Sequence, residues 1–179
     1  MKIGIIGAGN IGSAVALHFR KLGHAMLIAN SRGPETLSQV DRETGATPAD
    51  VLGAAKGLDL LVIAIARKNV PSLPKDSLSD LPSSSPIADT RNYYPLRDGG
   101  ITEIYGGMVE SEWTSGELGR SVIKALNNSM AKLRPDFPPQ ELLRVARLSA
   151  GLDLWNPRSW AALLHYPSSA MRSSGAAKQ

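Results

Sequence analysis

The sequence of 179 residues contains no cysteine, and only 5% of its residues are aromatic. The lack of cysteine excludes a disulfide framework and a thiolate metal site, and we predict no metal site of any other kind. No apolar run approaches the roughly 20 residues that a membrane-spanning helix needs. Met1 and Lys2 lead directly into an expected strand, which is not the pattern of a signal peptide. We therefore expect a cytoplasmic protein with no membrane partner.

Charge is balanced over most of the chain, although the net charge at pH 7 is +4. Residues 1–128 contain 13 basic and 13 acidic side chains, whereas residues 129–179 contain 7 basic and 3 acidic ones. Evenly mixed charge is typical of a solvated surface and not of a basic stripe that follows a phosphate backbone. We therefore predict no nucleic-acid partner.

A glycine-rich motif near the N-terminus lies between an expected strand at 3–6 and a helical pattern at 13–22, and a second strand follows at 25–29. In dinucleotide-binding units the first glycine allows the tight turn, the second lets a pyrophosphate approach the backbone, and the third lets the helix pack on the strand. A glycine-rich turn in another β-α-β protein is the alternative. We predict that a dinucleotide, with its phosphates at the helix N-terminus, is bound by Gly7, Ala8, Gly9, Asn10, Ile11 and Gly12.

The residues after the second expected strand indicate which dinucleotide is bound. Enzymes that use NAD usually carry an acidic residue there, which repels a 2′-phosphate. This chain has Asn30, Ser31 and Arg32 instead, and the hydroxyl and guanidinium groups can pair with a phosphate. We predict NADP(H) as the cofactor. Alternatively, Asn30 and Ser31 only cap a helix that begins near Pro34.

Strand and helix patterns alternate through the rest of residues 1–128. The residues predict helices at 34–44, 48–56 and about 75–81, and strands at 45–47, 60–65, 87–90 and 121–126. The continuous apolar run at 60–65 is typical of a parallel strand that is covered on both faces. We therefore predict a doubly wound parallel α/β sheet of the Rossmann type, in one NADP-binding domain over residues 1–128.

Four segments, in order, resemble the family of NADP oxidoreductases that depend on coenzyme F420. They are the glycine loop, residues 30–35, the segment Asp89-Thr90-Arg91-Asn92-Tyr93-Tyr94-Pro95 with residues 97–99, and Ser111-Glu112 with residues 122–127. The resemblance implies hydride exchange between NADP(H) and a small-molecule acceptor, F420 or a flavin-like compound. It also implies that the backbone of Ala64 and Ile65 lies beside the cofactor, that Asn92 contributes to the same site, and that a homodimer is one expectation.

No acid–base constellation is visible, so the sequence identifies no catalytic residue. The histidines are His18, His24 and His165, and packing or surface roles are expected for the first two. Hydride transfer between two stacked rings needs no catalytic triad. Two other functions stay open. One is an imine or carbonyl reductase similar to pyrroline-carboxylate reductase, and the other is a non-catalytic NADP-binding module or degraded enzyme.

Several positions near expected strand ends have two interpretations. Tyr93 and Tyr94 either border the acceptor ring or pack with satisfied hydroxyls. Lys124 and Asn127 resemble a family motif, and a structural role at the strand end is the alternative. Arg67 stands where the family often has an aromatic or apolar residue, which affects the wall of the site.

Residues 129–179 depart from the resemblance. They contain a proline-rich segment at 133–139, one helical pattern at 140–150, and an end rich in serine and alanine. An out-of-frame reading of a GC-rich gene produces such a composition, and the family's elements for the acceptor pocket and a dimer contact are not recognisable. The segment is therefore a frameshifted, partly disordered end or, alternatively, a divergent tail that forms two helices and packs on the sheet.

Overall fold

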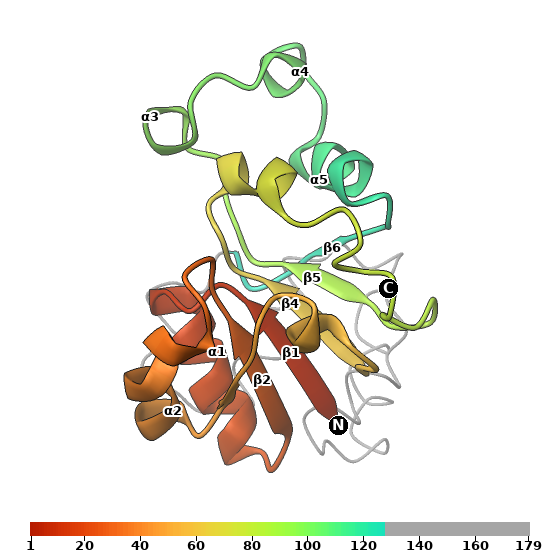
Figure 1. The fold of residues 1–179 in the computed structure, drawn as a ribbon. Coiled ribbons are helices and arrows are strands. Elements are labelled where there is room, and N and C mark those ends of the chain that lie inside the picture. The colour runs from red at the N-terminus through yellow and green to blue at the C-terminus, as the bar shows by residue number, and fades with distance from the viewer. Residues whose placement is uncertain (128–179) are drawn as a thin grey trace, which may run out of the picture.

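Six strands form one parallel sheet in the computed structural model, which describes residues 1–127. The strand order is β3-β2-β1-β4-β5-β6, and each neighbouring pair is parallel (Figure 1). The chain moves outward from β1 to β3 and restarts at β4 on the other side of β1, so the β1–β4 boundary is the switch point where doubly wound sheets bind ligands. The strands are β1 (Lys2–Ile6), β2 (Ala25–Ala29), β3 (Thr47–Pro48), β4 (Leu60–Ile63), β5 (Ile87–Asp89) and β6 (Ile123–Lys124).

Apolar side chains cover both faces of the central strands, as expected for a buried parallel sheet. Every residue of β4 is buried, and so is every residue of β1 after Lys2. Successive residues of a strand point to opposite faces. Accordingly, Ile5 belongs to the core cluster that includes Phe19 of the first helix, and Ile6 belongs to a second cluster with Ile63.

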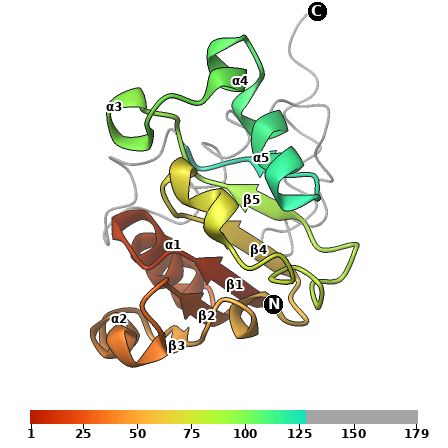
Figure 2. The ribbon, with the colours of Figure 1, turned by 45° about the horizontal axis from the view of Figure 1, so that its top comes forward.

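Helices and shorter 3-10 turns connect the strands. They are α1 (Asn10–Lys21), η1 (Pro34–Leu37), α2 (Ser38–Thr44), η2 (Gly53–Ala55), η3 (Arg67–Ser72), α3 (Pro95–Asp98), α4 (Thr102–Tyr105) and α5 (Glu110–Leu118). Helices α1 and α2 lie next to each other beside β1 and β2. Residues 90–122 contain α3, α4 and α5 and form an arm that projects beyond the carboxyl ends of the strands (Figure 1 and Figure 2).

The fold class predicted from the sequence is confirmed, but two predicted helices are wrong. At 48–56, Pro48 pairs at the sheet edge in β3, and the Asp50 carboxylate accepts a hydrogen bond from the Gly53 N–H at 2.6 Å. This bond caps the start of a helical turn, and the chain leaves the helical conformation at Lys56 and at Gly57, which has a φ of 58°, so only the single turn η2 forms. At 75–81, prolines 74 and 82 bound a series of tight turns in which the N–H groups of Ser77, Ser79 and Leu81 donate to the carbonyls three residues earlier.

The predicted strands exist with different bounds. The strand predicted at 45–47 is β3 at 47–48, the strand predicted at 87–90 ends at Asp89, and the one predicted at 121–126 pairs only at 123–124. The apolar run at 60–65 leaves the sheet after Ile63, although its last residues are as apolar as the others. The helices of the arm were not predicted, because the apolar residues of α5 follow no helical period.

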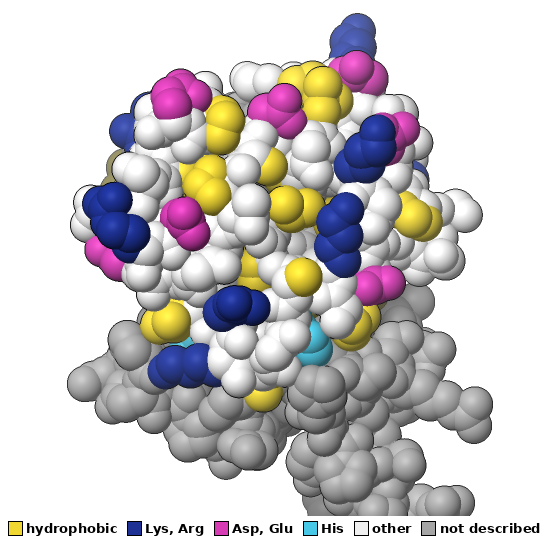
Figure 3. Space-filling view, turned by 60° about the horizontal axis from the view of Figure 1, so that its bottom comes forward, with side chains coloured by type: hydrophobic (Ala, Val, Ile, Leu, Met, Phe, Trp, Pro, Cys, Tyr) yellow, Lys and Arg dark blue, Asp and Glu magenta, His cyan; other side chains and the backbone are white. Residues whose placement is uncertain are grey.

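The remaining predictions concern the C-terminal segment, the domain boundary, membrane helices, metal ligands and surface charge. The predictions for residues 129–179 lie outside the described residues, and the domain boundary at 128 stays a prediction. Within residues 1–127 no helix is long and apolar enough to cross a membrane. Over that same range, no group of three metal-ligating side chains is brought together. Basic and acidic side chains are interspersed on the face shown in Figure 3.

Two glycines allow backbone segments to touch at the end of β1. A Cβ atom added to Gly12 in α1 would collide with the carbonyl oxygen of Gly7. Gly7 itself has a φ of 117°, and a Cβ atom there would lie 2.6 Å from the carbonyl oxygen of Ala64. At Gly9, in contrast, an added Cβ atom meets nothing within 4 Å. This is the geometry of a turn glycine at 7 and a packing glycine at 12.

We expect Gly12→Ala to lower the free energy of unfolding by about 1–3 kcal/mol, because α1 must move away from Gly7 to admit the methyl group. The higher helix propensity of alanine offsets about 1 kcal/mol of the packing cost. Urea unfolding followed by circular dichroism measures the change. Gly9→Ala is the matched control, since the same methyl group enters open space. Equal stabilities of the two variants would contradict the packing role of Gly12.

Candidate functional site

A cleft of about 800 Å³ lies at the carboxyl ends of β1, β2 and β4. Its walls come from the glycine loop, the loop after β2, the segment after β4, and residues 50–52 and 69–74. Eight residues predicted from the sequence line this cleft: Gly7, Ala8, Gly9, Asn30, Ser31, Arg32, Ala64 and Ile65. Asn10, Ile11 and Gly12 belong to the first turn of α1, which follows directly, and Asn92 lies outside the cleft lining.

The glycine loop presents backbone rather than side chains to the cleft. The Gly7 N–H donates to the Ala29 carbonyl at 2.8 Å, which ties the end of β1 to the end of β2. Helix α1 begins after Gly9, and no side chain caps its N-terminus. The first N–H groups of a helix have no partner within the helix. An uncapped helix N-terminus beside an open glycine is therefore suited to bind an anionic group such as a pyrophosphate.

The loop after β2 carries the exposed side chains of Ser31 and Arg32. The Asn30 side chain is turned inward on the loop, where its Oδ1 accepts a hydrogen bond from the Arg32 N–H at 2.9 Å. Gly33, and neither Asn30 nor Ser31, precedes the first turn of η1, and no side chain caps that turn. The alternative interpretation of these two residues as helix caps is therefore wrong.

Asn92 joins the ends of β5 and β6. Its Nδ2 donates to the Asn127 carbonyl at 3.0 Å, and the Asn127 Nδ2 donates to the Asn92 Oδ1 at 3.0 Å. Lys124 forms an ion pair with Glu110 of α5. These contacts agree with the structural interpretation of Lys124 and Asn127, while the cofactor contact expected of Asn92 stays a prediction.

The two tyrosines of the arm differ in their surroundings. The Tyr93 hydroxyl donates to the Gly99 carbonyl at 2.7 Å and accepts from the Ile101 N–H at 3.1 Å, and its ring packs edge to face on Tyr105. Tyr93 is therefore a packed aromatic with a satisfied hydroxyl. Tyr94 is 47% exposed, and the Arg97 guanidinium lies 5.0 Å from the centre of its ring.

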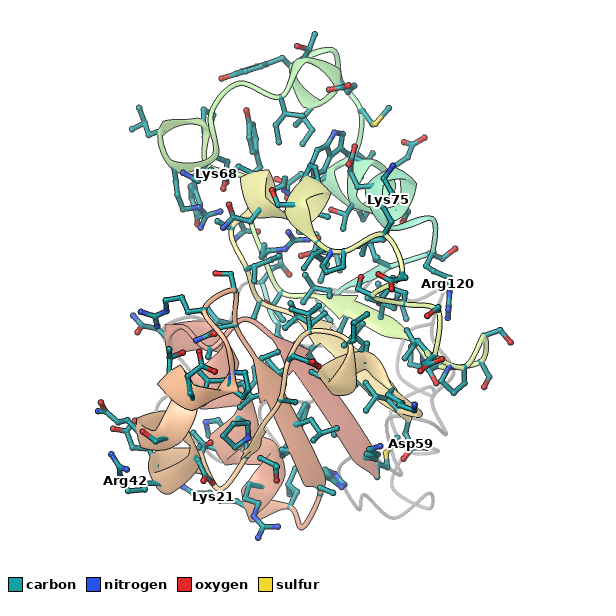
Figure 4. The ribbon with its side chains drawn as sticks, in the orientation of Figure 1. Lys21, Arg42, Asp59, Lys68, Lys75 and Arg120 are labelled. Atoms are coloured by element: carbon teal, nitrogen blue, oxygen red, sulfur yellow. The ribbon has the colours of Figure 1, made fainter. Side chains whose placement is uncertain are left out.

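Arg67 is fully buried and faces away from the cleft, although it directly follows the lining residues 64–66. Its Nη1 donates to the Thr114 hydroxyl at 2.6 Å and to the Glu110 carbonyl at 2.8 Å, both in α5. Its Nη2 donates to the Glu110 carboxylate at 2.8 Å and lies 3.5 Å from the Asp89 carboxylate. Figure 4 shows side chains of η3 and α5 meeting above β5. Arg67 thus connects the segment after β4 to the arm.

Further charged groups surround Arg67. The Arg91 guanidinium bonds Asp89 at 2.7 Å, and burial lowers the pKa of Arg91 against the attraction of that carboxylate. Asp98 accepts the Arg67 N–H at 3.1 Å and pairs with Arg97 at 2.7 Å. Burial by itself would raise the pKa of Asp98, but hydrogen bonds from Arg97 and the Tyr94 N–H lower it. The bond to Asp98 in turn raises the pKa of Arg97.

The sequence did not identify the partners of Arg67. Glu110 and Thr114 are four residues apart and therefore share one face of α5. Such a polar pair usually lies on the solvated side of a helix, so the burial of Thr114 is recognised only once Arg67 is known to face it. The only sequence signal was the presence of an arginine at a position where an apolar residue was expected.

The family model described as NADP oxidoreductase coenzyme F420-dependent matches residues 2–93, about half of the chain. No curated protein matches the sequence. Among solved structures, a hypothetical protein from Sinorhizobium meliloti is 28% identical, with a TM-score of 0.59. The alignment covers 79% of this chain and 65% of that protein.

Two more distant structures share the fold. A protein from Arthrobacter sp., described as a candidate F420-dependent NADP reductase, is 22% identical, with a TM-score of 0.56 and coverage of 71% of this chain and 62% of that one. A 3-hydroxyisobutyrate dehydrogenase from Mycobacterium tuberculosis is 14% identical, with a TM-score of 0.52 and coverage of 69% and 39%. This chain therefore spans less than two thirds of the length of each of the three proteins.

We expect Arg67→Met to lower the free energy of unfolding by about 3 kcal/mol, because Asp89 then keeps only Arg91 and Glu110 only Lys124 as a charged partner, and the buried Thr114 hydroxyl loses its donor. Arg67→Lys keeps the charge but cannot form the forked bonds, so its loss should be smaller. Urea unfolding measures both variants. Arg32→Met, at an exposed position, is the matched control and should change stability by less than about 0.5 kcal/mol. If Arg67→Met lowered the free energy of unfolding no more than Arg32→Met does, Arg67 would not be the residue that connects the segment after β4 to the arm.

Proposed function

Because the chain belongs to the family of NADP oxidoreductases that depend on coenzyme F420, we propose that it transfers a hydride between NADP(H) and F420 or a flavin-like acceptor. The observation that supports this function best is the composition of the cleft at the switch point. A serine and an arginine are exposed directly after β2, and residues 30–33 contain no carboxylate. Such a loop accepts the 2′-phosphate that distinguishes NADP from NAD.

The residues of the cleft fit a dinucleotide. A volume of about 800 Å³ is within the range of small-molecule sites. The open position at Gly9 and the uncapped N-terminus of α1 would receive the pyrophosphate, and Ser31 and Arg32 would receive the 2′-phosphate. The backbone of Ala64 and Ile65 would then form the wall beside the rest of the dinucleotide. The bound cofactor supplies the hydride chemistry, and the protein supplies orientation and electrostatics.

The acceptor would bind next to the cleft, on the side of the arm. The arm leaves the sheet at the carboxyl end of β5, where open α/β sheets bind ligands. Tyr94 offers an exposed aromatic face there, and Asn92 is held close by through its pair with Asn127. Transfer of a hydride requires two rings in contact and no proton relay, so these residues would act by positioning the acceptor.

We expect Arg32→Ala to weaken NADPH binding about ten- to a hundredfold, because a hydrogen bond to a charged group contributes roughly 1.5–3 kcal/mol. The dissociation constant of NADH should change by less than about twofold, since NADH lacks the 2′-phosphate. Isothermal titration calorimetry measures both constants. The control is Arg42→Ala, which removes an exposed arginine on α2 that does not line the cleft (Figure 4). Equal affinities of the unmodified protein for NADPH and NADH would contradict the NADP assignment.

An assay of NADPH oxidation identifies the acceptor. With oxidised F420, FMN and a cyclic imine as separate acceptors, we expect the highest kcat/KM with F420. Preference for the imine would favour an imine reductase. Tight NADPH binding without oxidation by any of the three acceptors would favour a non-catalytic binding module.

A further inference from the structure

The loop that follows β2 is closed by its own side chains. The Asn30 Oδ1 accepts the Arg32 N–H at 2.9 Å, and the Asn30 Nδ2 donates to the Thr36 hydroxyl at 2.9 Å. The Thr36 hydroxyl in turn donates to the Gly33 carbonyl at 2.8 Å. Gly33 has a φ of 96°, so the backbone turns sharply between Asn30 and Thr36, which these hydrogen bonds connect.

The side chains of Asn30 and Arg32 differ in whether they have a partner within the loop. Both polar atoms of the Asn30 amide are engaged within the loop, whereas no described residue receives a hydrogen bond or ion pair from the Arg32 guanidinium. The hydroxyl of Thr36 connects the amide to the backbone of Gly33 and lies outside the cleft lining. Thr36, which does not line the cleft, thus holds the loop in one conformation through Asn30.

We propose that Thr36 is a positioning residue that sets the preference for a 2′-phosphate by holding Asn30, and through it the backbone of Arg32. The inference rests on the proposed use of NADP(H) and adds a residue that the sequence motif does not contain. Ordering a flexible loop on binding weakens affinity, and a loop held in the bound conformation beforehand avoids this cost. Only a ligand that contacts Ser31 and Arg32 binds more tightly because the loop is ordered beforehand. The effect therefore favours a ligand with a 2′-phosphate over one without it.

The test compares adenosine 2′,5′-bisphosphate with AMP, two probes that differ in the 2′-phosphate and need no acceptor. Thr36→Val removes the hydroxyl at an exposed position and nearly preserves side-chain shape. We expect the bisphosphate to bind about fivefold more weakly to this variant, the loss of about one hydrogen bond, while AMP binding changes by less than about twofold. Thr36→Ser keeps the hydroxyl and should retain the preference of the unmodified protein. Ser38→Ala, which removes an exposed hydroxyl from the next turn, is the matched control.

Hydrogen exchange of the Arg32 amide, measured by NMR without ligand, tests the loop independently of the cofactor. Exchange should become faster in Thr36→Val and stay unchanged in Thr36→Ser and Ser38→Ala. An unchanged exchange rate in Thr36→Val, or an equal loss of affinity for the bisphosphate and for AMP, would overturn the proposal while the NADP assignment stands. If the unmodified protein binds both probes equally, the NADP assignment fails and the specificity role of Thr36 fails with it, even where the exchange rate responds.

Discussion

The site depends on the contact of three backbone segments at the end of β1. Gly7 ends the strand, Gly12 lies in the first turns of α1, and Ala64 follows β4, and no Cβ atom fits where they meet. This contact brings the ends of β1 and β4 to the N-terminus of α1, whose first N–H groups no side chain caps. The central part of the cleft is therefore made of backbone, and two glycines decide its position.

The segment after β4 is held from both sides. Its cleft side touches Gly7, whereas its other side is attached through Arg67 to α5 and β5. The position of the arm relative to the cleft is thus coupled to the same few residues that form the cleft wall. A buried guanidinium suits this task because it donates in several directions within one plane, and each carboxylate that it meets would be costly to bury alone.

The sequence predicts the sheet and the cleft better than the polar contacts. Apolar runs identify the buried strands, and the glycine loop identifies the switch point, because both signals are local. Arg67 and Glu110 are 43 positions apart in the sequence, and no local pattern reports such a pair. The predicted helix at 48–56 is shortened from both ends, because Pro48 pairs in β3 and Gly57 adopts a positive φ, and only the turn capped by Asp50 is left. At Asn30 the sequence identifies a polar residue after β2, but only the structure shows that its amide is engaged within the loop.

The two halves of the proposed reaction differ in how far the family match supports them. Every residue that lines the cleft lies between Ile6 and Pro74, inside the matched range of 2–93. The arm and β6 lie almost entirely beyond that range. A cofactor shared by a family requires the same backbone cradle in each member, whereas an acceptor is selected by whatever covers the exposed face of the nicotinamide. Differences in acceptor between this chain and its relatives would therefore arise in the arm, through Tyr94 and its neighbours, and not in the glycine loop.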